Sequence, residues 1–233
     1  MSRVHHRHHH YHYDHVAWCY EWIARVFSFG AIPRVKASQT SMMKAGQRVL
    51  YVGVGTGEDA LLAAREGVHV TCLDLSGAML HRLRRRFAEE GIRAEIVEAD
   101  IVDYDSGRPF DVVVANFVLN VFPEAAMREV LRHIESLLSP EGVLLIADFT
   151  PPGQGRFERV IFPAYYRPIN IAAWLLRLCA LHPIYDYARV FPDAGLELVT
   201  RSSQSSQRHA RTDVHSSRFY ECIVAKPLRG RRE

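Results

Sequence analysis

Val-Leu-Tyr-Val-Gly-Val-Gly-Thr-Gly-Glu-Asp, residues 49 to 59, is the stretch that decides the fold of this chain. An apolar run gives way to glycines at alternate positions, Gly53, Gly55 and Gly57, which is typical of a strand, a tight turn and a helix start. Because glycine has no Cβ, these positions can take positive φ and let a ligand lie against bare backbone at the helix N-terminus. The stretch predicts a loop that binds a nucleotide or an amino-acid carboxylate.

The spacing of the glycines separates two classes of nucleotide fold. A dinucleotide-binding fingerprint reads G-x-G-x-x-G, whereas this chain reads G-x-G-x-G and has Glu58 where the third small residue would stand. A nucleotide-dependent oxidoreductase is therefore the disfavoured interpretation.

Two later apolar runs end in an acidic residue. Residues 68 to 73 end at Asp74, and the next run ends at Ala99, Asp100 and Ile101. Carboxyl ends of neighbouring parallel strands meet at one edge of a sheet, where an acidic side chain can hydrogen-bond a ribose diol.

The pattern of apolar runs predicts the fold class. Runs rich in Val, Ile and Leu cover residues 94–97, 111–115 and 143–147, as expected of strands buried on both faces of a parallel sheet. Segments with helical spacing alternate with them, and residues 196–201 and 219–225 are expected to form a final strand pair. The chain is predicted to be an α/β protein with a doubly wound, mostly parallel sheet, whose ligands lie at the carboxyl ends of the strands.

With these residues the chain resembles the class I S-adenosyl-L-methionine (SAM)-dependent methyltransferases, over about residues 45 to 150. The resemblance implies a Rossmann-like, seven-stranded sheet with N-terminal helices and a helical lid. It implies that the glycine loop wraps the methionine part of SAM, that Asp74 holds the ribose, and that Asp100 and Ile101 meet the adenine. It places Asn116 near the transferred methyl group, in a catalytic and cofactor-binding role. The alternative is that Asn116 is a turn residue whose side chain hydrogen-bonds its own backbone.

The position two residues before the first glycine departs from the family pattern. The family has Asp or Glu there, and this chain has Tyr51. We assign Tyr51 to the cofactor site as a neutral replacement and expect that an acid restored at this position strengthens SAM binding. The same departure motivates an alternative function, that of a SAM-binding protein of this fold that does not methylate.

The most informative region for the substrate is an insertion at about residues 155–192, which is rich in aromatic and apolar side chains. Similar lids in quinone and phospholipid methyltransferases close over lipophilic acceptors. We assign catalytic roles to His182, as a base that titrates near neutrality, and to Tyr185. The alternative for the aliphatic residues is a helix pair packed on the sheet.

The two ends of the chain lie outside this pattern. Residues 1–15 are rich in histidine and are expected to be a disordered, tag-like tail, to which no metal site is assigned. Residues 16–227 form the single predicted domain, which begins with an amphipathic helix over residues 16–27. Residues 228–233 are a basic tail.

Composition limits the possible functions. The chain has 233 residues and a formal net charge of +3, and its basic blocks are not interleaved with aromatic residues, so nucleic acid is not an expected partner. Its four cysteines form no C-x-x-C pair, and neither a signal sequence nor a membrane-spanning apolar segment is visible, which favours the cytoplasm. The expected activity is methyl transfer from SAM to a small, apolar or aromatic acceptor. The oligomeric state is left open.

Overall fold

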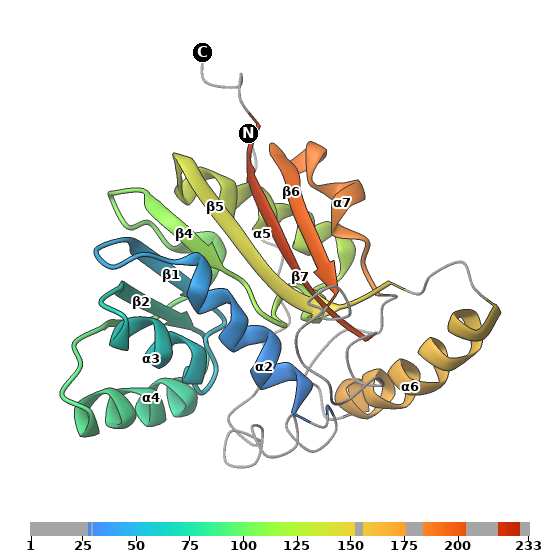
Figure 1. Cartoon of the computed structure of the whole chain (residues 1–233), viewed down its shortest axis with the longest axis horizontal. Helices are drawn as coiled ribbons and strands as arrows, with labels where there is room; N and C mark the ends of the chain where they lie inside the picture. Colours follow the sequence, from blue (N-terminus) through green and yellow to red (C-terminus); the bar gives the residue numbers. More distant parts are fainter. Residues whose placement is uncertain (1–27, 29, 152–155, 176–183, 204–218, 229–233) are drawn as a thin grey trace.

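The computed structural model describes residue 28 and residues 30–151, 156–175, 184–203 and 219–228. Within residues 156–175, some side chains are not described. These residues form a sheet of seven strands in the order β3-β2-β1-β4-β5-β7-β6, with helices on both faces (Figure 1). The predicted fold class is confirmed.

The sheet is parallel except at one edge. Neighbouring strands from β1 to β5 pair in parallel, whereas β7 is antiparallel to both β5 and β6. The strands are β1 (Arg48–Val52), β2 (His69–Asp74), β3 (Glu95–Glu98), β4 (Phe110–Val114), β5 (Leu138–Phe149), β6 (Leu196–Ser203) and β7 (Tyr220–Pro227). The chain reverses the order of strands between β1 and β4, the point at which such sheets bind ligands.

Alternating side chains of the central strand divide the core into two layers. Leu50 and Val52 pack with α5 and α7, whereas Val49 and Tyr51 pack with α3 and α4. Strand residues alternate between faces, so an unbroken apolar run buries both. The covering helices are α3 (Glu58–Arg65), α4 (Gly77–Glu89), α5 (Glu124–Leu137) and the short α7 (Tyr187–Val190).

Helix α2 (Ala31–Ser38) leads into the sheet and crosses near the carboxyl ends of its strands (Figure 1). The sequence predicts one helix over residues 33–43, but the structure begins it at Ala31, after Gly30 with φ 75°, and continues it as a 3-10 turn, η2 (Gln39–Met42). Glycine at the N-cap allows the earlier start. The tighter turn brings Gln39 into the protein, where it is buried.

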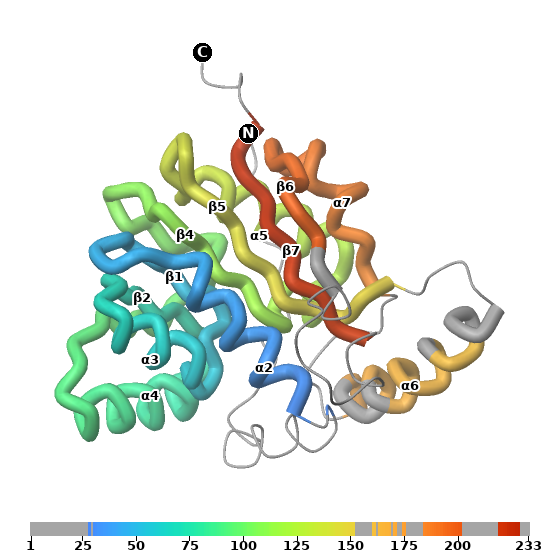
Figure 2. The backbone as a smooth tube through the Cα atoms, in the orientation of Figure 1, coloured from blue at the N-terminus to red at the C-terminus, as the bar shows by residue number. Residues whose placement is uncertain are grey.

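Helix α6 (Arg156–Leu175) lies beyond the carboxyl end of β5 and the amino end of β7, at the lower right of the tube trace in Figure 2. Its described side chains divide into two faces: Tyr166 and Asn170 are buried, whereas Ile171, Trp174 and Leu175 are exposed. In the described ranges no helix has the length and apolar character needed to span a bilayer. This helix occupies the predicted lid region, and the proposed boundaries of that insertion stay a prediction.

Candidate functional site

The glycine loop between β1 and α3 has the predicted conformation. Gly53, Gly55 and Gly57 have φ values of 61°, 57° and 67°, which side chains other than glycine rarely adopt. A Cβ on Gly53 would lie 2.4 Å from Val118, and one on Gly57 would lie 2.2 Å from Leu83, so these two glycines allow close packing. A Cβ on Gly55 would meet no atom within 4 Å. The backbone at Gly55 therefore borders open space, as a ligand cradle requires.

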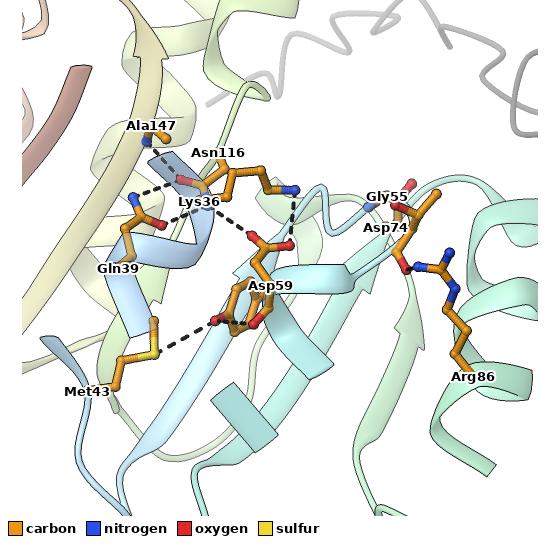
Figure 3. A network of polar contacts seen from close by, with 11 residues as sticks. Lys36, Gln39, Met43, Gly55, Asp59, Asp74, Arg86, Asn116 and Ala147 are labelled. Atoms are coloured by element: carbon orange, nitrogen blue, oxygen red, sulfur yellow. Dashed lines mark hydrogen bonds and ion pairs between the residues drawn. The ribbon is translucent and has the colours of Figure 1, made fainter. Parts of the chain in front are cut away.

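Asp74 holds this loop from the end of β2. Its Oδ2 accepts a hydrogen bond from the Gly55 N–H at 2.8 Å, and its Oδ1 accepts one from the Ser76 N–H at 2.9 Å. The guanidinium of Arg86, on α4, donates to the carbonyl of Thr56 at 3.2 Å on the other side of the loop (Figure 3). A carboxylate oxygen has more than one lone pair, so Asp74 can order the loop and accept hydrogen bonds from a ligand diol as well.

Asp100 follows the neighbouring strand β3. Its Oδ1 accepts from the Val102 N–H at 3.2 Å and so caps the 3-10 turn η3 (Ile101–Asp103), whose first side chain is buried. Asp74 pairs with Glu98 across β2 and β3, which brings the ends of the two strands together. Acids at adjacent strand ends beside a bare glycine loop fit a ligand with a nucleoside part, such as SAM.

Asn116 follows β4 and lies in a buried polar network (Figure 3). Its Oδ1 accepts from Gln39 at 3.0 Å and from the Ala147 N–H at 2.8 Å. Its Nδ2 donates to Gln39 at 2.8 Å and to Asp59 Oδ2 at 3.0 Å. Both amide hydrogens and both oxygen lone pairs are thus in use. In this arrangement Asn116 joins α2, α3 and β5, and its predicted role beside the methyl group stays a prediction.

Asp59 is the acid of this network. It lies in the first turn of α3, its side chain is 4% exposed, and Lys36 Nζ lies 3.0 Å from its Oδ1. The pair connects α2 to the helix that begins at the glycine loop. Burial of a carboxylate is costly unless it is paired and hydrogen-bonded, and Lys36 and Asn116 meet both conditions.

Tyr51 lies behind the glycine loop, in the core under α3. Its hydroxyl donates to the Asp59 carbonyl at 3.3 Å and lies 3.7 Å from the Met43 sulfur. Burial, and then the charge of Asp59, raise the pKa of the Tyr51 phenol far above its usual value. The side chain is 3% exposed. This position does not favour the direct cofactor contact assigned from the sequence, because the hydroxyl is directed at backbone in the core.

Aromatic side chains gather where β4 and β5 end and the antiparallel β7 begins. Phe117, whose φ is 53°, packs edge-to-face against Phe149 and Tyr220, with ring centroids 5.8 Å apart in each pair. Tyr166 of α6 packs against Phe149 at 5.0 Å, and the Tyr165 hydroxyl lies 2.8 Å from that of Tyr220. The left-handed conformation of Phe117 directs its ring into this cluster, which we call the aromatic cluster.

Tyr185 lies beside a buried acid rather than among the rings of the aromatic cluster. Its hydroxyl donates to the Phe122 carbonyl at 2.9 Å, and its ring packs against Tyr187. The Tyr187 hydroxyl in turn donates to Asp148 at the end of β5. Burial raises the pKa of the Asp148 carboxyl to about 6, and its three hydrogen bonds limit the rise. The Tyr185 side chain is 6% exposed. Its catalytic role stays a prediction.

The remaining assigned residues fall outside the description. His182 and the histidine-rich residues 1–15 lie outside the described residues. Across the ranges that are described, no three His, Cys, Asp or Glu side chains come close enough to hold a metal ion.

The sequence analysis did not single out two buried acids. Asp59 follows the glycine loop directly and looks like an ordinary acid in the first turn of a helix. Asp148 ends the apolar run of β5. The feature that identified Asp74 and Asp100, an acid at the carboxyl end of a predicted strand, applies equally to Asp148 and would have found it.

Comparison with known proteins identifies the family. Residues 49–142 match the family described as "Methyltransferase domain". The chain is 30% identical over 189 residues to a phosphatidylethanolamine N-methyltransferase of Cereibacter sphaeroides, covering 79% of this chain and 88% of the relative. It is 34% identical over 146 residues to a demethylmenaquinone methyltransferase of Clavibacter sepedonicus, covering 60% of this chain and 57% of that relative's length.

A solved structure supports the fold. The 1,6-didemethyltoxoflavin-N1-methyltransferase of Burkholderia thailandensis, crystallised with its substrate and S-adenosylhomocysteine (SAH), matches with a TM-score of 0.63 at 18% identity, over 92% of this chain and 88% of that one. The glycine loop, the strand-end acids, the sheet order and the sequence match agree, and the chain belongs to the class I SAM-dependent methyltransferases.

Proposed function

We propose that this enzyme transfers the methyl group of SAM to a small, lipophilic, ring-bearing acceptor of the quinol type. The observation that carries the proposal is the aromatic cluster, which lies at the carboxyl edge of the sheet next to the strand end that bears Asn116. Flat rings favour edge-to-face and offset contacts with other aromatic rings. Names of relatives agree with this class, since demethylmenaquinone and ubiquinone-pathway methyltransferases are among them.

The proposal assigns the cofactor roles to residues at the strand ends. SAM, when bound, would supply an electrophilic methyl group on a sulfonium, from which the thioether SAH is a good leaving group. In the proposal the backbone at Gly55 lies against its methionine part, Asp74 accepts from the ribose hydroxyls, and Asp100 with Ile101 borders the adenine. The carboxylate of Asp74 already bonds the Gly55 N–H, so one side chain both shapes the loop and binds the ribose.

The chain's main contribution to rate is alignment. Holding two reactants in line can supply roughly 7 to 11 kcal/mol of the barrier. In the proposal Phe117, Phe149 and Tyr166 hold an acceptor ring and exclude water from it. The Tyr165 and Tyr220 hydroxyl pair supplies a polar contact within the aromatic cluster. A quinol must lose a proton to become a strong nucleophile, and His182 remains the proposed base.

The test is a transfer assay with tritium-labelled SAM. A short-chain demethylated naphthoquinol is offered in one reaction and phosphatidylethanolamine in mixed micelles in another. The proposal predicts label in the quinol. Transfer to phosphatidylethanolamine alone would refute the ring-bearing class while leaving the family assignment intact.

A second arm tests the aromatic cluster itself. Phe149→Leu and Tyr166→Leu each remove an aromatic contact worth about 0.5 to 1.5 kcal/mol, so the acceptor KM should rise about twofold to tenfold. SAH affinity should not change, because neither side chain borders the glycine loop. Leu198→Ala, on an exposed part of β6, is the matched control. A loss of SAH affinity in the cluster variants as large as the rise in acceptor KM would contradict the assignment of the aromatic cluster to acceptor binding.

The alternative is a SAM-binding protein of this fold that does not methylate. Tyr51 in place of the family's acid is the observation that favours it. SAM consumption without label in any acceptor, or SAH binding without turnover across the acceptor screen, would support this alternative over methyl transfer.

A further inference from the structure

A buried carboxylate, that of Asp148, lies at the end of β5, next to Phe149 of the aromatic cluster in the sequence. Asp148 is 2% exposed, and three donors converge on it: Asn120 Nδ2 and the Phe149 N–H on Oδ1, and the Tyr187 hydroxyl on Oδ2. The bonds from Asn120 and Tyr187 tie β5 to the 3-10 turn η4 (Leu119–Val121) and to α7, whereas the bond from the Phe149 N–H lies within β5.

The turn that Asn120 anchors also touches the glycine loop. Val118 fills the space where a Cβ of Gly53 would stand, 2.4 Å from the position of that atom. At its other end the turn begins with Phe117, whose N–H donates to the Ala147 carbonyl at 2.9 Å. We call residues 117–121 the bridging turn. Its position against Gly53 depends on how firmly Asn120 is held at β5.

The same carboxylate also holds the chain near the end of the predicted lid insertion, at Tyr187 of α7. Three successive residues contact different parts of the fold: Tyr185 the Phe122 carbonyl, Asp186 the Arg201 guanidinium of β6 at 3.0 Å, and Tyr187 the Asp148 carboxylate. Asp148 therefore contacts both the bridging turn, which begins with Phe117, and α7, near the end of the insertion that also contains Tyr166.

We propose that Asp148 is a positioning residue of the methyl-transfer site, whose ionised carboxylate holds the bridging turn against the glycine loop and fixes the chain at residues 185–187. The carboxylate form suits this role because it accepts from all three donors. A protonated carboxyl carries a hydrogen of its own, which competes with the hydrogen of the Tyr187 hydroxyl. Protonation also weakens the charge-assisted hydrogen bonds from Asn120 and the Phe149 N–H.

The surroundings of Asp148 make its charge sensitive to pH in the neutral range. Burial raises its pKa to about 6, and Glu221 adds to the rise. Glu221 pairs directly with Asp148 across β5 and β7, so the two side chains lie on one face of the sheet. The charged and titratable groups that face this cluster are Glu221, Arg201, Asp186, Tyr185, Tyr187 and Tyr166. Arg201 neutralises Glu221 through a bidentate pair and lies next to Asp186.

The test uses SAH binding to the full chain, measured by calorimetry between about pH 5.5 and pH 8. If SAH binding lowers the pKa of Asp148 by about one unit, linkage gives an affinity about threefold weaker at pH 5.5 than at pH 8, with release of about half a proton per SAH at pH 5.5. Titration in buffers of different ionisation enthalpy measures the proton release directly.

The variants assign the effect to Asp148. Asp148→Asn should abolish both the pH dependence and the proton release, and Glu221→Gln should shift the midpoint to lower pH because it removes a like charge. Asp193→Asn, an exposed acid on η5 (Pro192–Ala194), is the matched control and should behave like the parent. Asn120→Ala should weaken SAH binding at pH 8 and flatten its pH dependence, which provides a test even if Asp148→Asn does not fold.

The outcomes that overturn the proposal are specific. Parent protein whose SAH affinity does not change between pH 5.5 and pH 8 overturns it. So does Asp148→Asn that keeps the parent's pH profile, or Asn120→Ala that matches the parent at every pH. None of these results depends on the acceptor, so they leave the proposed substrate class untouched.

Discussion

Replacing Tyr51 with aspartate tests whether the position before the glycine loop is a cofactor contact or part of the core. The sequence analysis expects Tyr51→Asp to strengthen SAM binding, because the family has an acid there. The structure supports the opposite expectation. The ring is 3% exposed and packs in the layer under α3, and its hydroxyl donates to the Asp59 carbonyl. An aspartate at this position would leave a cavity and add a carboxyl next to Asp59.

The magnitude follows from these two effects. Truncating a large buried aromatic side chain costs roughly 3 to 5 kcal/mol, and burying a polar group without a hydrogen-bond partner adds roughly 1 to 3 kcal/mol. Domains of this kind have a total stability of roughly 5 to 15 kcal/mol. Tyr51→Asp should therefore lose about half or more of that stability, whereas Tyr51→Phe should lose only about 0.5 to 1.5 kcal/mol, the worth of one hydrogen bond.

The assay is urea unfolding together with SAH titration of the parent, Tyr51→Phe and Tyr51→Asp. A double variant with Asp59→Asn measures the coupling, because the added carboxyl should be less costly without the neighbouring charge. SAH affinity of Tyr51→Phe should equal that of the parent. A folded Tyr51→Asp that is as stable as the parent and binds SAH more tightly would refute the reasoning and restore the cofactor-contact assignment.

Four further changes have defined outcomes. Gly55→Val should abolish SAH binding in a folded protein, because a Cβ there enters the open space beside the loop and opposes a φ of 57°; unchanged affinity in titration would exclude this cradle. Asp74→Ala should weaken SAH binding by roughly 1.5 to 3 kcal/mol, or about tenfold to a hundredfold, with Asp74→Asn intermediate; no loss would move the ribose elsewhere. Removing residues 1–13 should leave unfolding and SAH binding unchanged, since that segment has no apolar periodicity; activity lost on deletion and restored by added metal would contradict the tail assignment. The pKa of Asp148 is raised in the folded state, so its protonated form contributes stability below the unfolded pKa, and this contribution is lost as pH rises through about 6. Asp148→Asn does not titrate, so its free energy of unfolding should increase relative to that of the parent by up to about 3 kcal/mol between pH 4 and pH 7.5, measured by urea unfolding. A difference in stability that stays constant with pH would show that Asp148 does not titrate in this range.

The fold and the cofactor edge were predictable because both depend on local pattern. Buried parallel strands are continuous apolar runs, and a turn that needs positive φ needs glycine, so the sheet and the loop at residues 53–57 can be identified one segment at a time. Asp74 and Asp100 could be assigned to the same edge because the carboxyl ends of parallel strands always meet. The resemblance to the family implies that residues 219–225 form an antiparallel strand, which the structure shows as β7, whereas their own sequence does not specify the direction.

What only the tertiary structure decided is which side chains meet across the chain. Nothing local to Asn116 predicts that its amide is fully engaged by Gln39, Asp59 and the Ala147 N–H, from three other segments. Likewise the pKa of Asp148 is raised chiefly by its burial in the assembled fold, and further by Glu221, which β7 places opposite it, while the hydrogen bond from Tyr187 of α7 limits the rise. Sequence periodicity specifies which face of an element is buried, because it repeats within that element. Burial, charge and hydrogen bonding at a site depend on contacts between residues far apart in the chain, and these exist only once the sheet has assembled.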